Sequence, residues 1–401
     1  MKIIHTGDWH IGKIVNEFSM IEDQKFVLKE LIEVVKEEKP DALVISGDLY
    51  DRSIPPVEAV ELLNDVLSKI LLELKVPVLA IAGNHDSSER LSFASEILSK
   101  NGLYIAGLFD ENIKTVTIEK EDEKLNFFLL PYADPKEIKH IYQDEEIQTH
   151  DDAMRKVVKI INKKLNKDEN NILVAHGYVT FMSEVALDGS NNEENKRAGL
   201  EISSSERPLS IGGTDLINGR HFNAFNYTAL GHLHGPQKVG SDKMRYSGSI
   251  LKYSFSEVNH KKGVVVVEIN KAGEVTALHK ELKPRRDMRI IKGPINKLIN
   301  PEVYRNDNVE DYIYAILTDE EELIDPITKL RAVYPNIMGL HREEGREKEE
   351  SKTSAATGFQ NKSKSKLFEE FYESITGRKL TENKLSLITE IIEDADKELN
   401  K

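Results

Sequence analysis

Five short segments of this chain share one layout, in which an apolar run of strand length ends and Asp, His or Asn follows at once. They read MKIIHTGDWH, ALVISGDLYD, VPVLAIAGNHD, NILVAHG and TALGHLH. Buried parallel strands are near-continuous runs of Val, Ile and Leu, and the loops at their carboxyl ends open onto one edge of the sheet. We therefore expect an α/β fold in which polar residues far apart in the sequence meet at one sheet edge.

The polar residues after these runs are of the types that bind metal ions, namely Asp8, His10, Asp48, Asn84, His176, His232 and His234. In Asp8-Trp9-His10 and His232-Leu233-His234, the i, i+2 spacing puts both side chains on one side of an extended chain. Such a set suffices for two ions that share a carboxylate, the arrangement of a two-metal phosphoesterase centre. Imidazole and carboxylate together suit manganese, iron or zinc better than calcium.

Glycines adjoin these candidate ligands, at positions Gly7, Gly47, Gly83, Gly177 and Gly231. A residue without a Cβ atom permits sharp turns and close approach of the backbone to an ion or a phosphate. The glycines therefore fit the same interpretation.

Composition bounds the class of protein. A chain of 401 residues suggests two or three domains. The sequence has no cysteine, which excludes disulfides, thiolate metal sites and thiol nucleophiles. No apolar run reaches membrane-spanning length and no signal peptide precedes the first strand, so we expect a cytoplasmic protein with no membrane partner. The net charge of −14 opposes contact with nucleic acid, and it favours a partner that supplies part of any DNA grip.

Residues 1 to about 280 alternate strand-like and helix-like patterns. Helical periodicity runs over residues 22–38, 55–74, 88–100 and 151–166. After Tyr227, strands follow without helices between them, which indicates an antiparallel or mixed half. We expect two packed sheets flanked by helices. The long polar stretch from Ala186 to Phe225 lies between two ligand segments, and we expect it to border the substrate entrance.

The composition changes from Lys283. A basic stretch, either a solvated face or a DNA contact, precedes a small α/β unit with strands at 312–317 and 336–341 and a helix at 325–334. Residues 343–364 are charged and predict a flexible linker. Residues 365–401 predict two short amphipathic helices, which either dock on a partner or fold back on the small α/β unit.

The order GDWH, GDLYDR, GNHD, HG and GHLH resembles the calcineurin-like metallophosphoesterases. The segments MKIIHTGDWHIGK, SERPLSIGGTDLI and RYSGSILKYSFSE resemble the SbcD branch, the nuclease subunits of SbcCD complexes. The resemblance implies a two-sheet nuclease domain over residues 1–282, a capping domain over residues 283–342, and the linker and helix-loop-helix docking segment described above.

The resemblance also implies roles for single residues. Asp8, His10 and His234 would hold one ion, Asn84, His176 and His232 the other, and Asp48 would bridge them. His85 would be the catalytic histidine that faces the scissile phosphate, although a role as an orienting residue behind the ligands is the alternative. Asp51 and Arg52 either contact phosphate or form a structural ion pair. The remaining histidines serve as negative controls: His5, His140, His150, His221, His260, His279 and His341.

The function implied is a Mn²⁺-dependent DNA nuclease for repair and recombination, which trims double-stranded ends 3′ to 5′ and opens hairpins. Its partners would be double-stranded DNA, an SbcC-like ATPase and a second copy of the chain within a heterotetramer. The chain has no G-x-x-x-x-G-K-[ST] loop, so ATP would act through the ATPase. The alternatives are a phosphoprotein phosphatase or small-molecule phosphodiesterase on the same metal scaffold, and a non-catalytic scaffold.

Overall fold

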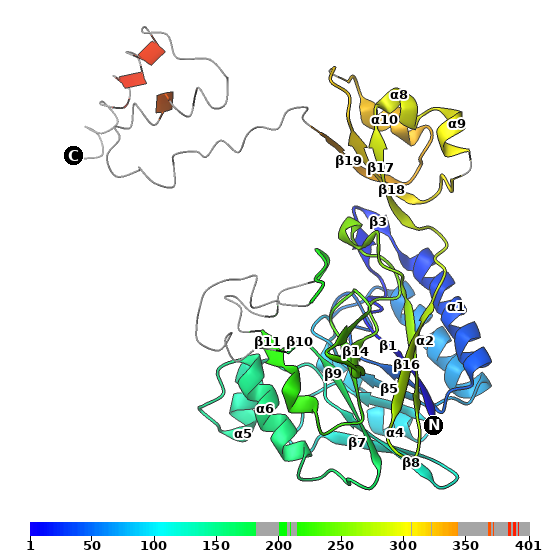
Figure 1. The fold of residues 1–401 in the computed structure, drawn as a ribbon, viewed down its shortest axis with the longest axis vertical. Helices are drawn as coiled ribbons and strands as arrows, with labels where there is room; N and C mark the ends of the chain where they lie inside the picture. Colours follow the sequence, from blue (N-terminus) through cyan, green and yellow to red (C-terminus); the bar gives the residue numbers. More distant parts are fainter. Residues whose placement is uncertain are drawn as a thin grey trace. The chain divides into compact units, whose positions relative to one another are not determined.

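The computed structural model describes residues 1–181, 200–206, 209, 215–305, 307–321 and 323–343, and eight residues of the C-terminal part. The chain divides into two compact units, Met1–Glu343 and Glu344–Lys401 (Figure 1). Each unit is described by itself. Among the described helices, none is long and apolar enough to cross a membrane.

Two six-stranded sheets form the body of the first unit. The first sheet has the order β16 (Val275–Glu281), β15 (Gly263–Ile269), β1 (Lys2–Thr6), β4 (Ala42–Ile45), β5 (Val78–Ile81) and β6 (Leu103–Ala106). The second has the order β13 (Gln237–Val239), β14 (Ser241–Tyr246), β12 (Tyr227–Gly231), β9 (Asn170–His176), β8 (Glu123–Leu129) and β7 (Lys114–Lys120). In both sheets the central strands run parallel and antiparallel strands close an edge, so the sheets are mixed, as expected.

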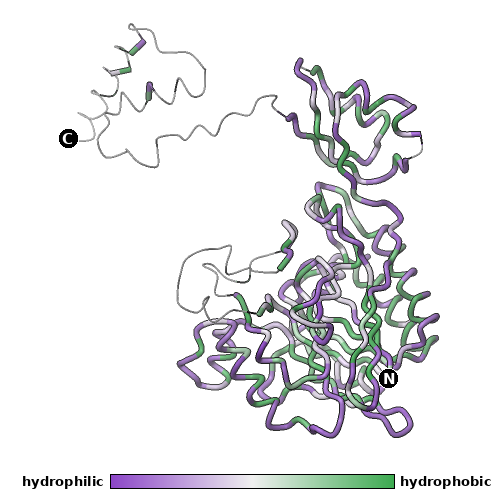
Figure 2. The backbone as a smooth tube through the Cα atoms, viewed as in Figure 1, coloured by the Kyte–Doolittle hydropathy of each residue, from purple (hydrophilic) through white to green (hydrophobic). Residues whose placement is uncertain are grey.

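The core follows from the alternation of side chains along each strand. In β1, Ile3 is buried between the two sheets, whereas Ile4 is buried beneath the helices on the other face. Helices α1 (Ile21–Glu38) and α2 (Val57–Ser68) cover the first sheet, and α5 (Pro135–Tyr142) and α6 (His150–Ile161) cover the second (Figure 1). Figure 2 shows hydrophobic strands in the interior and hydrophilic outer faces on the helices. The predicted two-sheet sandwich flanked by helices is confirmed.

Several helices differ from the sequence prediction. The helix expected over residues 88–100 is two short helices, α3 (Ser88–Ser92) and α4 (Ser95–Ser99). The break lies at Phe93, which is extended, and at Ala94, which has a φ of 55°. The helical periodicity of apolar residues continues across the break, so the sequence did not predict it. The second helix leaves α-geometry after Ser68 and continues as the π-helix η1 (Lys69–Glu73).

The last two differences concern the helices on the second sheet. Helix α6 ends at Ile161, before the predicted end at 166, although its start is fixed by a capping box between Thr149 and Asp152. Helix α5 was not predicted. Its signal was Asp134 as the N-cap directly before Pro135 in the first turn.

Smaller elements complete the body. They are the hairpin β2 (Ile14–Val15) and β3 (Phe18–Ser19), the parallel pair β10 (Tyr178–Thr180) and β11 (Leu216–Asn218), and the 3₁₀ turns η3 (Gly219–Phe222) and η4 (Phe255–Glu257). The pair β10–β11 follows the candidate ligand segment at His176, so it lies on the path of the chain out of that segment.

A third, three-stranded sheet lies in the expected capping region. It consists of the parallel strands β17 (Met288–Gly293), β18 (Tyr312–Leu317) and β19 (Ile337–Arg342), with α8 (Ile295–Leu298), α9 (Pro301–Tyr304) and α10 (Pro326–Arg331). The predicted basic stretch is partly strand β17, and two of its charges in that strand pair with acidic residues of the chain. Arg289 pairs with Asp311 and Lys292 with Glu343.

A buried ion pair links this sheet to α1. Asp23 is fully buried and accepts two bonds from the Arg286 guanidinium, one of them at 2.9 Å from Nε. The hydroxyl of Tyr312 donates to the same carboxylate at 2.8 Å. The next residue, Gln24, faces the other way and donates to the carbonyl of His10 at 2.7 Å. Helix α1 therefore touches both the third sheet and the loop after β1.

In the second unit, the described residues are helical, namely 368, 369, 372, 384, 385, 388, 389 and 392. The ammonium of Lys384 lies 6.0 Å from the ring centre of Tyr372, which joins the two predicted helical segments. The predicted linker after Glu343 and the rest of the helical pair lie outside the described residues.

Candidate metal centre

All seven predicted ligands meet at the carboxyl ends of β1, β4, β5, β9 and β12. Donor atoms of Asp8, His10 and His234 lie within 4.8 Å of one another, and so do those of Asp48, His176 and His232. The amide oxygen of Asn84 lies 3.0 Å from His176 Nε2 and 3.0 Å from His232 Nδ1. The seven side chains thus form two adjacent donor groups.

Asp48 stands between the two groups. Its Oδ2 atom lies 3.6 Å from His10 Nε2 and 3.5 Å from His176 Nε2. Its Oδ1 atom accepts a hydrogen bond from the backbone N–H of His85 at 2.9 Å. One carboxylate therefore faces an imidazole of each group.

Backbone carbonyls fix two of the imidazoles. His176 Nδ1 lies 2.8 Å from the carbonyl of Ser46, and His85 Nδ1 lies 2.8 Å from the carbonyl of Asp51. A carbonyl only accepts, so each Nδ1 carries the proton and donates it. The Nε2 atom of His176 is then free to bind an ion, and that of His85 is free to exchange a proton with a substrate.

The donor set fits divalent transition metals. It consists of imidazole nitrogens and carboxylate and amide oxygens, almost all fully buried. The Nε2 atoms of His10 and His234 face each other at 3.0 Å, and the buried Nε2 of His232 has no hydrogen-bond partner. Buried polar atoms are normally satisfied. Nitrogen atoms that face each other or lack a hydrogen-bond partner can bind a metal ion through their lone pairs.

Four of the predicted ligand residues adopt a backbone conformation that L-residues rarely take. The φ angles are positive at Asp8 (52°), His10 (46°), Asp48 (51°) and His232 (108°). Strained backbone clusters at functional sites, where the surrounding structure imposes it. The sequence carried no sign of this feature.

Two glycines permit the close approach that the sequence led us to expect. A Cβ atom at Gly83 would lie 2.2 Å from Asp48 Oδ1, and one at Gly231 would lie 1.9 Å from the carbonyl oxygen of Ser46. Neither site has room for a side chain, because the obstructing atoms belong to the centre or to the backbone beneath it.

Burial and mutual charge shift the pKa values of the cluster in opposite directions. Burial alone would raise the pKa of Asp48, but His176 and His10 hold it well below its usual range. Burial raises the pKa of Asp8 well above its usual range. Burial lowers the pKa of His176, yet the neighbouring Asp48 carboxylate outweighs it and raises the value to about 9. Asp48 is thus the anionic centre of the cluster.

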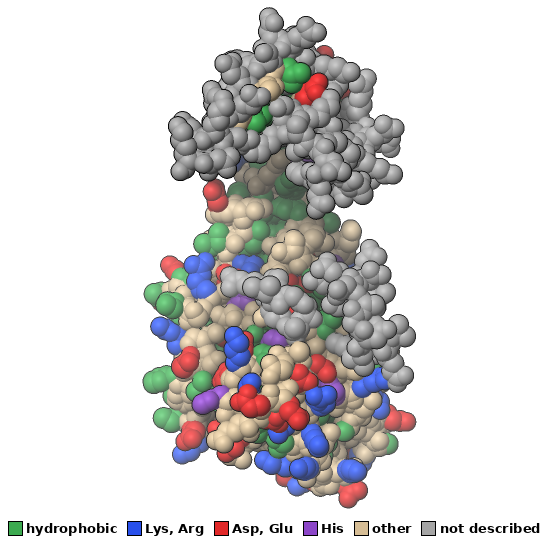
Figure 3. Space-filling view, turned by 90° about the vertical axis from the view of Figure 1, so that its left-hand side faces the viewer, with side chains coloured by type: hydrophobic (Ala, Val, Ile, Leu, Met, Phe, Trp, Pro, Cys, Tyr) green, Lys and Arg blue, Asp and Glu red, His purple; other side chains and the backbone are tan. Residues whose placement is uncertain are grey.

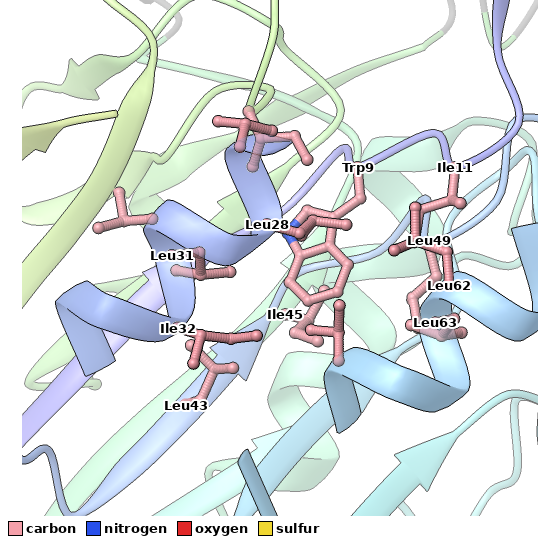
Figure 4. Close-up of a cluster of buried hydrophobic side chains, with 14 of the residues drawn as sticks. Trp9, Ile11, Leu28, Leu31, Ile32, Leu43, Ile45, Leu49, Leu62 and Leu63 are labelled. Carbon is pink, nitrogen blue, oxygen red and sulfur yellow. The ribbon is translucent and has the colours of Figure 1, made fainter. Parts of the chain in front are cut away.

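A hydrophobic cluster supports the ligand loops from below. Trp9, between Asp8 and His10, is fully buried, and its indole N–H donates to Thr6 Oγ1 at 2.9 Å. Figure 4 shows its ring between α1 and α2, among Leu28, Ile45 and Leu63. Trp9 therefore packs beneath the loop that carries Asp8 and His10.

Asp51 and Arg52 differ in their surroundings. Asp51 is buried and bonds Lys13 Nζ at 2.7 Å, whereas the Arg52 side chain is about half exposed, with Nη2 3.9 Å from Asp51 Oδ2. Asp51 also lies with His10 and His85 in a third group of donor atoms. The ion-pair interpretation fits Asp51, and Arg52 is the more accessible side chain.

Sequence reasoning missed several supporting residues. Asp86 accepts backbone N–H groups of Leu49, Tyr50 and Gly83, which ties two ligand loops together, and burial raises its pKa to about 7. Its place in the GNHD segment was the available signal. Glu206 accepts the backbone N–H of His234 at 2.6 Å. That part of the long polar stretch reaches the centre, while residues 186–199, 207, 208 and 210–214 lie outside the described residues.

The seven control histidines lie outside the two donor groups described above. Among the described residues, none of them joins a group of metal-type donors. His5 is fully buried between the sheets, 3.0 Å from the hydroxyl of Tyr227 and 3.1 Å from that of Ser46. Its polar partners are satisfied without an ion.

Charged side chains of both signs lie on the face of the body that Figure 3 shows. Figure 3 shows Lys and Arg side chains interspersed with Asp and Glu over the face in view. This mixture agrees with the net charge of −14. It differs from the basic surface typical of proteins that bind nucleic acid without a partner subunit.

Comparison with known proteins gives two matches to family models. Residues 1–236 match the calcineurin-like phosphoesterase model, which is more than half of the chain. Residues 284–376 match the SbcD C-terminal model, described as the type 5 capsule protein repressor C-terminal domain.

Solved structures give weaker likenesses. One is a protein of Thermus thermophilus, with 11% identity and a TM-score of 0.37, covering 69% of this chain and 98% of that one. The calcineurin-like phosphoesterase YfkN from Bacillus subtilis has 12% identity and a TM-score of 0.34, covering 71% and 90%. A dimetal phosphatase from Danio rerio has 10% identity and a TM-score of 0.36, covering 69% and 98%.

Proposed function

The chain belongs to the calcineurin-like phosphoesterase family, and on that premise we propose that it is a two-metal phosphodiesterase that cleaves DNA as the nuclease subunit of an SbcCD-type complex. The observation that carries the two-metal part is the position of Asp48, whose Oδ2 atom faces His10 Nε2 at 3.6 Å and His176 Nε2 at 3.5 Å. One carboxylate between two donor groups is the arrangement needed to share a ligand.

The donor groups suggest the assignment of ligands. Asp8, His10 and His234 would hold one divalent ion, and Asn84, His176 and His232 the other, with Asp48 common to both. Ions bound there supply Lewis-acid stabilisation of a phosphodiester anion and lower the pKa of water. Nitrogen and oxygen donors together suit Mn²⁺, our candidate for the native metal.

His85 is the proposed catalytic residue. Its Nδ1 donates to the carbonyl of Asp51, which orients the ring and leaves Nε2 to hold a proton for the leaving oxygen. Its ring packs edge-on against His10, with ring centres 4.6 Å apart. His85 therefore lies beside the proposed ions without forming part of either ligand group in the assignment above.

The match of residues 284–376 to the SbcD C-terminal model supports DNA as the substrate and an SbcC-like ATPase as the partner. A phosphatase acting on small substrates does not account for this additional region. The acidic net charge also favours a partner that contributes to the grip on DNA.

Exposed apolar side chains support the proposed homodimer. Val57 and Val60 on α2, and Phe93 and Ile97 around α4, are between 45% and 81% exposed. An exposed apolar patch typically marks an interaction site, and we propose that these side chains form one. Sedimentation of the intact chain tests this proposal, and a monomer at micromolar concentration would contradict it.

The experiment that tests the function compares three substrates in the presence of Mn²⁺: linear duplex DNA, bis-p-nitrophenyl phosphate and a phosphopeptide. We expect degradation of the DNA ends and no turnover of the phosphopeptide. A chain that dephosphorylates the peptide and leaves DNA intact would instead be a phosphoprotein phosphatase. Asp48→Asn serves as the inactive control, since it removes the proposed shared ligand charge.

A further inference from the structure

A buried polar group lies behind His234, on the side of the ring away from the metal centre. It consists of Ser205, Glu257 and Lys262, all packed against His234. Glu257 is fully buried, and Lys262 is only 5% exposed. The ligand assignment above leaves this group without a role, although a buried ion pair costs free energy of desolvation.

We propose that Glu257 positions the metal-binding imidazole of His234 through the hydroxyl of Ser205. The inference rests on the proposed function and deepens it, since it adds a residue on which binding of one ion depends. Glu257 is a positioning residue in this role, because it touches neither substrate nor ion and acts only through another side chain.

The hydrogen bonds among these groups determine which atom holds each proton. Ser205 Oγ lies 2.5 Å from Glu257 Oε1 and 2.7 Å from His234 Nδ1. A hydroxyl has one proton to donate. Glu257 accepts a hydrogen bond from the ammonium of Lys262 at 2.5 Å, so it is an anionic acceptor. The hydroxyl of Ser205 therefore donates its hydrogen bond to Glu257.

The tautomer of His234 follows. The only hydroxyl hydrogen of Ser205 is used in the hydrogen bond to Glu257. Ser205 Oγ must therefore accept the hydrogen bond from His234, so Nδ1 of that ring carries the hydrogen. The opposite nitrogen, Nε2, then has a free lone pair, and this is the atom that faces His10 at 3.0 Å. Outer partners of metal-binding histidines commonly select the ligating nitrogen in this way.

Lys262 holds the carboxylate and the backbone of the ligand segment together. Its ammonium donates to Glu257, to the carbonyl of His234 at 2.7 Å and to Ser249 Oγ at 2.9 Å. Three acceptors satisfy the three donors of a lysine. A fixed Lys262 therefore ties Glu257 to the main chain of the residue whose ring it orients.

The serine comes from a distant part of the sequence. Ser205 and its neighbour Glu206 belong to the described stretch 200–206, and Glu206 accepts the backbone N–H of His234 at 2.6 Å. Ser204 N–H donates to Ser256 Oγ at 3.0 Å, which binds the same stretch to the turn that carries Glu257. Occupancy of this ion site therefore depends on a segment that provides no ligand.

The test is a Mn²⁺ titration of the full chain, followed by electron paramagnetic resonance of the free ion. In Glu257→Gln, an amide can donate to Ser205, whose hydroxyl then donates to His234 Nδ1. The neutral ring then holds its one hydrogen on Nε2, the nitrogen that would bind the ion. We expect one of two ions to bind about 10 to 100 times more weakly, with the other nearly unchanged. Ser205→Ala should have an effect in the same direction, and Ser205→Thr, which retains the hydroxyl, should restore affinity.

Two further variants keep the test decisive. The double variant Glu257→Gln/Lys262→Met removes both buried charges, so it can fold where an unpaired Lys262 cannot, and it should show the same selective loss. Asp311→Asn breaks a comparable buried pair with Arg289 in the third sheet and should leave both ions bound as in the wild type.

Wild-type affinity for both ions in Glu257→Gln and Ser205→Ala would overturn the positioning role and leave the proposed function standing. Equal weakening of both ions in these variants and in Asp311→Asn would also overturn it, because the effect would then be a general loss of stability. A wild-type chain that binds no Mn²⁺ would overturn the proposed function itself, and the inference with it.

Discussion

The Nε2 atom of His10 lies 3.0 Å from the Nε2 atom of His234, although the two residues are 224 positions apart. A cation bound to both nitrogens stabilises the folded chain, because the unfolded chain lacks this paired site. We therefore expect Mn²⁺ to raise the melting temperature of the chain and EDTA to lower it. At a hundredfold excess over its dissociation constant, one ion should add about 2.7 kcal/mol. Calorimetry with and without EDTA measures this, and identical curves would contradict it.

Asp48→Asn should abolish binding of both ions together. The substitution preserves shape but removes the one carboxylate that faces both donor groups. We expect loss of nearly all nuclease activity, a folded chain by circular dichroism, and fewer than one ion per chain by metal analysis. Two tightly bound ions in this variant would refute the shared role of Asp48.

His85→Ala should separate chemistry from metal binding. The ring is held by the carbonyl of Asp51 and lies outside the two proposed ligand groups, so both ions should remain. The cleavage rate should fall by about 10² to 10⁴, the range typical for loss of a general acid or base. Metal content is measured on the same preparation. An empty site would mean that His85 is a ligand, in accordance with its group with His10 and Asp51.

His5 makes stability depend on pH. Burial lowers its pKa from 6.5 to about 3 in the folded chain. Below pH 6.5 the unfolded chain therefore binds a proton that the folded chain does not, so this contribution to stability is present above pH 6.5 and is lost as the pH falls toward 3. The free energy of unfolding of the wild type, relative to His5→Asn, should fall by about 1.4 kcal/mol per pH unit in that window. Urea titrations at pH 7.5 and pH 5 measure it; a difference independent of pH would contradict it.

A chain that ends at Glu343 should retain Mn²⁺-dependent cleavage and lose association with the ATPase partner. The truncation falls at the boundary between the two compact units, so the metal centre is left intact. A linker of about twenty residues spans roughly 25 Å, enough to place a helical pair on another subunit. Pull-down with the ATPase and ATP-stimulated cleavage test the prediction. Full retention of both would mean that the tail belongs to this chain's own fold.

The sequence was most informative about the candidate ligands, because each of them lies just after an apolar run that predicts a strand. All seven proposed ligands follow apolar runs, and sheet geometry brings such positions together whatever their separation along the chain. The support behind the ligands was not predictable in this way. Ser205 and Glu257 meet across 52 residues without a shared pattern, and the positive φ angles of Asp8 and Asp48 arise from the assembled centre. The break at Ala94 is likewise a backbone conformation that leaves hydropathy unchanged.

Asp23 sets a limit on how this protein can be divided or recombined. Its fully buried carboxylate is satisfied by Arg286 and Tyr312, which both belong to the third sheet or its approach. A chain cut before residue 284 would leave that carboxylate uncompensated on α1, directly beside Gln24, which holds the loop of His10. The third sheet is therefore not an interchangeable module. Any exchange of this region between homologues has to carry a matching cation and hydroxyl, or the first ligand loop loses its anchor.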